Sequence, residues 1–130
     1  MKSNIEIIAQ LYADFGQGNI PAILEQLTDD VTWELPASAN VPFAGVFEGK
    51  AGVAVFFQHV AANNDFHLFN IEKLLADADT VVALGNLKAT AKTTGKTSNN
   101  KWAHRWDFNG SKVAHHYEYV DSAEIANAFS

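Results

Sequence analysis

The chain has 130 residues, of which 48% are hydrophobic, and its net charge at neutral pH is −6, which predicts one compact domain over residues 1–130. Its nine basic residues form no continuous stripe, which argues against nucleic-acid binding, and the absence of cysteine excludes disulfides and thiolate chemistry. The polar start and the lack of a long apolar run argue against a signal peptide and a membrane span, so a cytoplasmic protein that does not contact membranes is expected.

The first half of the chain has mainly the pattern of helices. Ser3 and Glu6 have the spacing of a capping box, and apolar residues follow it at helical intervals. Asp29-Asp30 is expected to break the second helix, and Pro36 to end the strand that comes next. The expected elements are a helix from Ser3 to the glycines at 16 and 18, a short helix over 19–27, a strand over 31–35, a loop over 36–48 and a helix beginning at Gly49.

The second half changes to the alternation of strands. We expect strands over residues 66–75 and 80–93, with turns at 76–79 and 94–100, and an aromatic-rich hairpin over 102–121. Asp121 can cap a short last helix. Helices followed by a meander of long strands predict an α+β fold, with the helices on one face of a curved sheet.

The hairpin turns at Asn109-Gly110, a strong signal for a tight turn. Its first arm places Trp102, His104, Trp106 and Phe108 on one face, because side chains alternate along a strand. Large aromatic side chains around one imidazole would form a pocket wall with His104 as its polar contact.

The length of the turn decides which row of the second arm joins His104. A two-residue loop places His104 on the same face as His115 and Tyr117, whereas a three-residue loop places it with His116 and Glu118. The apolar pattern alone favours the first alternative, because that row is the more apolar of the two.

The order of elements and several motifs resemble the SnoaL-like branch of the nuclear transport factor two superfamily. The motifs are Leu11-Tyr12-Ala13-Asp14-Phe15, Gly18-Asn19, Leu27-Thr28-Asp29-Asp30-Val31-Thr32-Trp33, Phe43-Ala44-Gly45 and Tyr119-Val120-Asp121. The resemblance implies a cone, in which a curved, mostly antiparallel six-stranded sheet wraps over three N-terminal helices and leaves a pocket at the open end. The superfamily contains isomerases, cyclases, hydrolases and dehydratases, and also members that only bind ligands.

The resemblance also bears on the hairpin. In the cyclase branch a pocket histidine on the penultimate strand precedes an acidic acid/base residue by fourteen positions, a spacing that His104 and Glu118 match with glutamate in place of aspartate. This favours the three-residue turn. It implies that Glu118 moves a proton and that His104 bonds the developing enolate oxygen or orients the carboxylate. Val113, Tyr117 and Tyr119 would then form an outward apolar row, which we expect a second copy of the chain to cover in a homodimer.

Ketosteroid isomerase, from the same superfamily, is a poorer match. With Gly18, Asp29-Asp30 and Asn109-Gly110 as landmarks, its catalytic tyrosine corresponds to Leu11, its aspartate base to Leu35 and its protonated aspartate to His104. A leucine cannot donate or accept a proton, so steroid isomerisation by that mechanism is not expected.

Further side chains are expected to surround the ligand. Two histidines and a carboxylate at His104, His116 and Glu118 could form a facial triad for iron, but we predict no metal and no cofactor. An ion pair between Arg105 and Asp107 is expected on the outer face. The predicted substrate-binding residues are Tyr12, Phe15, Trp33, Leu35, Phe43, Phe47, Phe56, Trp102, Trp106 and His116.

Together these features predict a cofactor-independent general acid/base enzyme, a cyclase, isomerase or related lyase or hydrolase. Its substrate would be a small, largely apolar carbonyl or polyketide-like molecule. The alternatives are a non-catalytic module that binds such a molecule in the same pocket, and a dimerising scaffold whose cone is filled by side chains.

Overall fold

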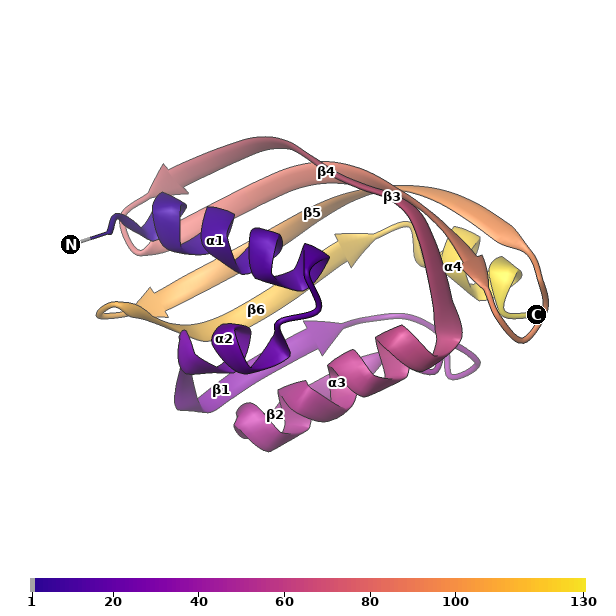
Figure 1. Ribbon diagram of the computed structural model, residues 1–130, viewed down its shortest axis with the longest axis horizontal. Helices are drawn as coiled ribbons and strands as arrows, with labels where there is room; N and C mark the ends of the chain where they lie inside the picture. The colour runs from indigo at the N-terminus through magenta and orange to yellow at the C-terminus, as the bar shows by residue number, and fades with distance from the viewer. Residues whose placement is uncertain (1) are drawn as a thin grey trace.

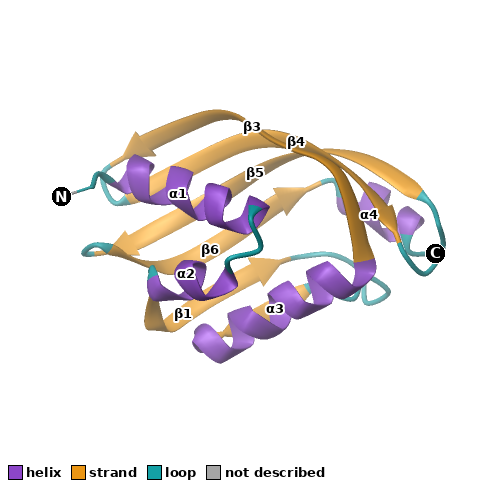
Figure 2. Cartoon of the chain, viewed as in Figure 1, coloured by secondary structure: helices purple, strands orange, loops and turns teal. Residues whose placement is uncertain are grey.

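The computed structural model describes residues 2–130 and has one curved sheet with helices against its concave face (Figure 1). The helices are α1 (Asn4–Gly16), α2 (Ile20–Glu25), α3 (Gly49–Asn63) and α4 (Ser122–Ala128). The strands are β1 (Leu27–Leu35), β2 (Gly45–Glu48), β3 (Asn64–Asp77), β4 (Thr80–Ala91), β5 (Thr97–Asn109) and β6 (Lys112–Val120). This is the α+β cone expected from the sequence, with α4 as a fourth helix at one end of the sheet (Figure 2).

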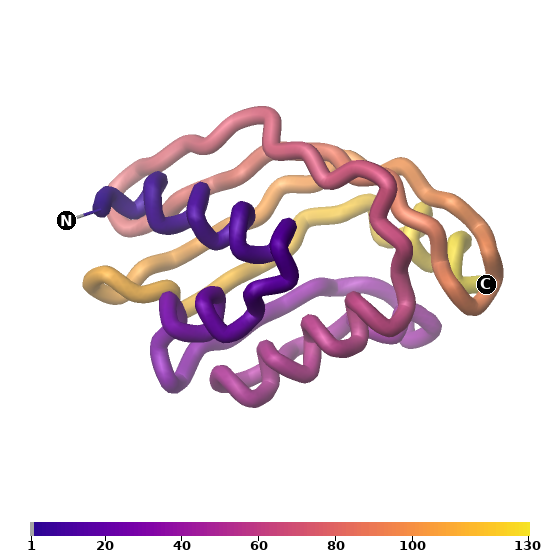
Figure 3. Tube along the Cα trace, viewed as in Figure 1, coloured from indigo at the N-terminus to yellow at the C-terminus, as the bar shows by residue number. Residues whose placement is uncertain are grey.

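The six strands lie in the order β2-β1-β6-β5-β4-β3, and every neighbouring pair is antiparallel except β1 and β6. The two arms of the aromatic hairpin, β5 and β6, are therefore the central strands. In the trace these two strands lie in the middle of the sheet, with α1 and α2 in front of them (Figure 3).

The helices begin where the capping residues predict. Ser3 Oγ accepts a hydrogen bond from the Glu6 amide at 3.2 Å, and the Glu6 carboxylate accepts one from the Ser3 amide at 3.1 Å. The Asp121 carboxylate caps α4 by accepting from the Glu124 amide at 3.1 Å. The helices and the sheet share one core of buried apolar side chains, including Ile8, Ile23, Leu27, Val31, Trp33, Val53, Val81 and Val113.

The region after α2 differs from the prediction. The second helix ends at Glu25, and β1 already begins at Leu27, so Asp29-Asp30 lies within a strand and not at a break. Both aspartates are exposed, in a part of β1 where its register with β6 is irregular. The segment predicted as loop contains β2, which pairs with the end of β1, and the positive φ of +123° at Gly45 falls where β2 starts.

The hairpin has the shorter of the two expected turns, but a bulge in β6 gives it the side-chain faces expected for the longer one. Its loop has two residues, Gly110 and Ser111, but Ala114 is an extra residue in β6: Phe108 pairs with Val113, whereas Asp107 pairs with His115. Such a bulge places one more residue on one strand than on its partner, so side chains after it change face. The three-residue turn is therefore wrong, although the face predicted for His116 and Glu118 is right. The outward orientation expected for Val113 is wrong as well, because Val113 precedes the bulge and is fully buried in the core.

Candidate functional site

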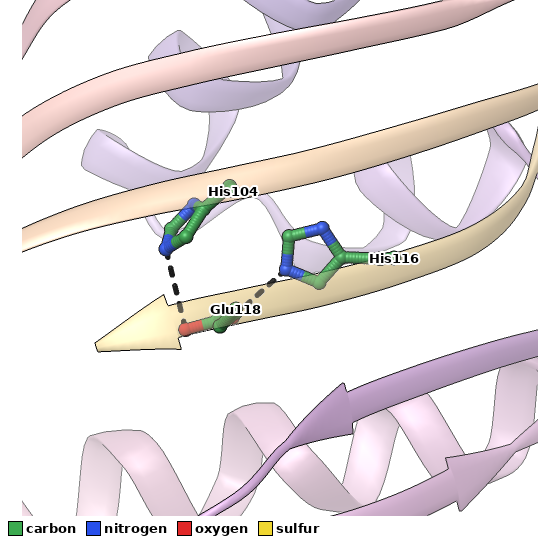
Figure 4. A group of neighbouring side chains, drawn as sticks. All are labelled: His104, His116 and Glu118. Atoms are coloured by element: carbon green, nitrogen blue, oxygen red, sulfur yellow. Dashed lines mark hydrogen bonds and ion pairs between the residues drawn. The ribbon is translucent and has the colours of Figure 1, made fainter. Parts of the chain in front are cut away.

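Three ionisable side chains meet on the concave face of the two central strands. His104 comes from β5, and His116 and Glu118 come from β6, where Glu118 is directly opposite His104 (Figure 4). His104 Nε2 lies 3.3 Å from Glu118 Oε1, and His116 Nε2 lies 2.9 Å from Glu118 Oε2. The three residues are 5%, 0% and 9% exposed, respectively. Each carboxylate oxygen of Glu118 is thus in contact with a different buried imidazole.

A tyrosine and a tryptophan extend this cluster toward α1. The Tyr12 hydroxyl lies 2.7 Å from His104 Nδ1, and the indole nitrogen of Trp106 donates to the same hydroxyl at 3.1 Å. Tyr12 reaches the sheet because Leu11 and Ile8 bury the neighbouring face of α1 in the core. The result is a continuous polar path from Trp106 through Tyr12 and His104 to Glu118.

Aromatic rings hold both imidazoles in place. His104 stacks on Trp102 with ring centroids 4.0 Å apart and an interplanar angle of 20°. His116 lies between two indoles, with its ring centroid 4.0 Å from Trp33 and 3.9 Å from Trp106. Rings packed this closely leave the imidazoles little freedom to rotate.

Burial and pairing set the charges of the cluster. Burial alone would raise the pKa of the Glu118 carboxyl, but the charges and hydrogen bonds of His104 and His116 outweigh burial and lower that pKa, so Glu118 is ionised. Burial lowers the pKa of His116 to about 4, so its imidazole is neutral at neutral pH. Burial also raises the pKa of the Tyr12 hydroxyl, which therefore keeps its proton.

The cluster lies on the wall of a cavity of about 100 Å³ between the sheet and the helices. The cone is thus not completely filled, which argues against the scaffold alternative. His104 and Glu118 line the cavity, together with most of the predicted substrate-binding residues, namely Tyr12, Phe15, Trp33, Leu35, Phe43, Phe56, Trp106 and His116. Leu11 and Leu35, the positions that correspond to catalytic residues of ketosteroid isomerase, also line it.

Two predicted substrate-binding residues are not in the cavity wall. Phe47 packs against Phe56, with ring centroids 5.3 Å apart. Trp102 lies behind the cavity, stacked between His104 and Phe69, with centroids 5.1 Å apart in the second pair. Trp102 therefore supports the site without lining it.

The sequence did not identify the β3 and α4 side chains that line the cavity. The alternation of β3 is interrupted at His67 and Glu72, so Phe66 and Phe69 share the inner face although three positions separate them. A pattern of strict period two cannot reveal this pair. Ile125, Ala128 and Phe129 close one end, and only the expectation of a last helix pointed toward them.

The same cluster has a donor set suited to a transition metal. His104, His116 and Glu118 each offer one ligand atom, and these atoms lie within 4.8 Å of one another. In the present geometry His116 is hydrogen-bonded to the carboxylate at 2.9 Å, and His104 Nε2 contacts its other oxygen at 3.3 Å. The absence of a metal in the native protein remains a prediction.

The comparison with protein families gives the same family as the motifs. The model of the SnoaL-like domain matches residues 8–116. The chain belongs to the SnoaL-like domain family. Among curated proteins, none matches this SnoaL-like chain.

Solved structures share the fold along almost the whole chain. An NTF2-like protein from Burkholderia xenovorans is 24% identical, with a TM-score of 0.90 over 98% of this chain and 95% of the other. TerC, crystallised with polyporic acid, is 25% identical, with a TM-score of 0.86 over 97% of both chains. A protein from Mesorhizobium loti, proposed to be a SnoaL-like polyketide cyclase, is 17% identical, with a TM-score of 0.73 over 91% and 99%.

Among residues 2–130, no helix is both long and apolar enough to cross a membrane.

Proposed function

We propose that this SnoaL-like protein is a cofactor-independent isomerase or cyclase that moves a proton on a small, largely apolar carbonyl or polyketide-like molecule. The observation that carries the proposal is the ionised Glu118 carboxylate, held by two imidazoles on the wall of an apolar cavity. Buried groups with shifted pKa values in a cavity mark functional sites.

Glu118 is the proposed base. Its carboxylate takes a proton from the carbon beside the carbonyl group and returns it to another carbon in an isomerisation. In a cyclisation the enolate carbon adds to a second carbonyl carbon of the same molecule, whose C=O π electrons move to oxygen, and the proton held by Glu118 passes to that alkoxide oxygen. His116 makes the shorter contact, 2.9 Å, and keeps the carboxylate oriented. His104 makes the longer one, 3.3 Å, so its N–H can pass from Glu118 to the enolate oxygen as negative charge develops there.

The similarity to TerC supports a ligand in this cavity. TerC was crystallised with polyporic acid, is 25% identical and matches 97% of this chain. The present chain has an internal cavity lined mainly by aromatic and aliphatic side chains, which suits a largely apolar ligand.

The proposal is tested by replacing the carboxylate. Glu118→Gln removes the base with little change of shape, so hydrogen–deuterium exchange at the α-carbon of a small ketone such as 2-indanone should slow by at least about a hundredfold. The exchange is followed by NMR in D2O, and circular dichroism verifies the fold. Glu34→Gln is the matched control, because Glu34 lies on the outer side of β1 and its carboxylate contacts His115.

Exchange that Glu118→Gln leaves at the wild-type rate would contradict the proposal and favour the binding-module alternative. One observation already favours that alternative. Every donor of the cluster has an acceptor within the protein, namely those of Trp106, Tyr12, His104 and His116. The cluster can therefore serve a purely structural role around a bound ligand.

A further inference from the structure

We infer that this cavity selects ligands that donate a hydrogen bond, such as phenols and enols, over ethers, simple ketones and carboxylates. The inference rests on the proposed function only in taking Glu118 as the polar contact of the ligand. It narrows the proposed carbonyl or polyketide-like class to molecules that carry a hydroxyl group, including the enol form of a carbonyl compound.

The direction of the hydrogen bonds starts at Trp106. An indole nitrogen can only donate, so the Tyr12 hydroxyl oxygen accepts from it at 3.1 Å. The single hydroxyl proton of Tyr12 is then free to point at His104 Nδ1, 2.7 Å away. A neutral imidazole that accepts at Nδ1 carries its proton at Nε2, which donates to Glu118 Oε1.

The geometry around Glu118 agrees with the same arrangement. An ionised carboxylate only accepts, so a bare His104 Nε2 at 3.3 Å would place two lone pairs against each other. A doubly protonated His104 would also donate from Nε2. In every favourable state, therefore, the Nε2–H of His104 is directed at Glu118.

His116 adds no free donor. Its Nε2–H is directed at Glu118 Oε2, 2.9 Å away, and its Nδ1 is a buried acceptor without a partner. The indole N–H of Trp33 also lacks a partner, but its nitrogen is buried and has almost no accessible surface. Within residues 2–130, the imidazole hydrogens beside Glu118 are thus already directed at its carboxylate, and the cavity surface there offers lone pairs to a neutral ligand.

Charge and distance exclude the other sources of donors. No lysine or arginine is among the described residues that line the cavity, so a ligand carboxylate would face the Glu118 carboxylate without compensation. Ser98 lines the cavity too, but it lies six residues from His104 along β5, about 20 Å in an extended strand. Asn64 donates one of its two amide hydrogens to the Val60 carbonyl oxygen at 2.9 Å and lies opposite Ala91 of β4, eight residues from Ala83, the partner of His104.

A ligand hydroxyl placed at Glu118 would give the carboxylate a third donor, beside the two imidazoles. An ether oxygen or a ketone oxygen in the same place would lose its hydration and gain no hydrogen bond. The volume of about 100 Å³ limits the ligand to about one ring, since a cavity of roughly 150 Å³ accepts benzene.

The test compares three probes with the same ring, phenol, anisole and benzoate, by titration calorimetry on the full chain. Phenol is expected to bind at least about tenfold more tightly than anisole, and benzoate more weakly than both. In Glu118→Gln the preference for phenol over anisole should fall to about threefold or less, because a carboxamide offers a donor as well as an acceptor. Glu34→Gln should keep the wild-type preference.

Three outcomes would overturn the inference: equal binding of phenol and anisole, an unchanged preference in Glu118→Gln, or no binding of any probe at millimolar concentration. None of these probes requires turnover. Phenol selectivity that depends on Glu118, together with ketone exchange that does not, would keep the inference and reject the proposed acid/base function.

A second measurement tests the directions of these hydrogen bonds directly. The ¹⁵N chemical shifts of the His104 ring are expected to show a protonated Nε2, and Tyr12→Phe should change the Nδ1 resonance while the chain stays folded. A wild-type spectrum with the proton on Nδ1 alone would also overturn the inference.

Discussion

His116 and His104 are chemically identical residues in different environments. His116 is fully buried between Trp33 and Trp106, and its only hydrogen-bond partner is Glu118. His104 has partners on both ring nitrogens. His116 therefore acts on Glu118 as a fixed neutral donor, whereas His104 connects Glu118 to Tyr12.

The buried state of His116 predicts a loss of stability in acid. The unfolded chain takes up a proton on this residue below its ordinary pKa of 6.5, whereas the folded chain resists until the pKa of about 4. Protonation thus favours the unfolded state in this window, and the free energy of unfolding should fall by about 3 kcal/mol as the pH is lowered from 6.5 to 4.

Urea titrations across this pH range measure the effect. His116→Gln should remove most of the slope, while His59→Gln, which changes an exposed histidine on α3, should keep it. The lowered pKa of Glu118 acts in the same direction further into acid, because its stabilising contribution is present above the ordinary carboxyl pKa and is lost as the pH falls toward the folded value. A slope that is unaffected by His116→Gln would contradict this account.

The donor set of the cluster leads to a separate prediction about metals. Because both Nε2 atoms donate to Glu118, we expect untagged protein to contain no stoichiometric transition metal. Elemental analysis measures this. About one equivalent of iron or zinc that disappears in His116→Ala would show that a metal replaces the two protons.

At the scale of the strand, Gly85 of β4 makes room for the support of His104. Gly85 pairs with Trp102, and a Cβ at this position would overlap the Trp102 ring and the backbone oxygen of Asn70. The absence of a side chain is therefore what allows Trp102 to lie flat against the sheet and stack on His104.

Gly85→Ala should accordingly destabilise the protein by about 3 kcal/mol, the upper part of the range for overpacked cores, because one of the overlapping groups is backbone. Chemical denaturation measures the loss, and tryptophan fluorescence reports the displacement of Trp102. The control is Gly16→Ala, since a Cβ at Gly16 meets nothing within 4 Å. Equal stability of the two variants would rule out the close packing of Trp102 on β4.

Most elements, though not β2 or the start of β1, could be predicted from the sequence because their signals are local. Ser3, Glu6 and Asp121 cap helices through contacts with residues three positions away, and such contacts are visible in the sequence. The resemblance to SnoaL-like proteins supplied the cone and the pairing of His104 with Glu118. The bulge at Ala114 and those in β3 could not be predicted, because they depend on how long strands bend over the helices.

The link from Tyr12 to His104 could not be predicted either. The two residues are 92 positions apart, and nothing in the local pattern of α1 distinguishes Tyr12 from an ordinary core tyrosine. Such a contact follows only from the way α1 crosses the sheet.

On the scale of the whole molecule, no helix among residues 2–130 covers the convex face of the sheet (Figure 1). Tyr117 and Tyr119 lie there with ring centroids 4.6 Å apart, and Tyr119 is 52% exposed. Beside them the expected ion pair of Arg105 and Asp107 is present at 3.0 Å, and His115 contacts the same carboxylate. We predict that a second copy of the chain covers this face.

Tyr117→Glu should weaken the homodimer by placing a charge in the apolar row, with little direct effect on the cavity. Sedimentation velocity at micromolar concentration measures the association. Val55→Glu is the control, because Val55 is an exposed apolar residue on α3, away from the convex face. A monomeric wild-type protein at that concentration would refute the prediction.

The extra residue at Ala114 has an evolutionary consequence. If Ala114 instead paired with Asp107 in a regular ladder, the two rows of β6 beyond it would be exchanged, bringing His115, Tyr117 and Tyr119 inward and turning His116 and Glu118 to the outside. The cavity would lose the Glu118 carboxylate and gain the phenol groups of Tyr117 and Tyr119. The convex face would then carry His116 and Glu118. In this hairpin, therefore, a one-residue change of register is a larger chemical step than a single substitution, and such a change is a route by which related cones could acquire different chemistries.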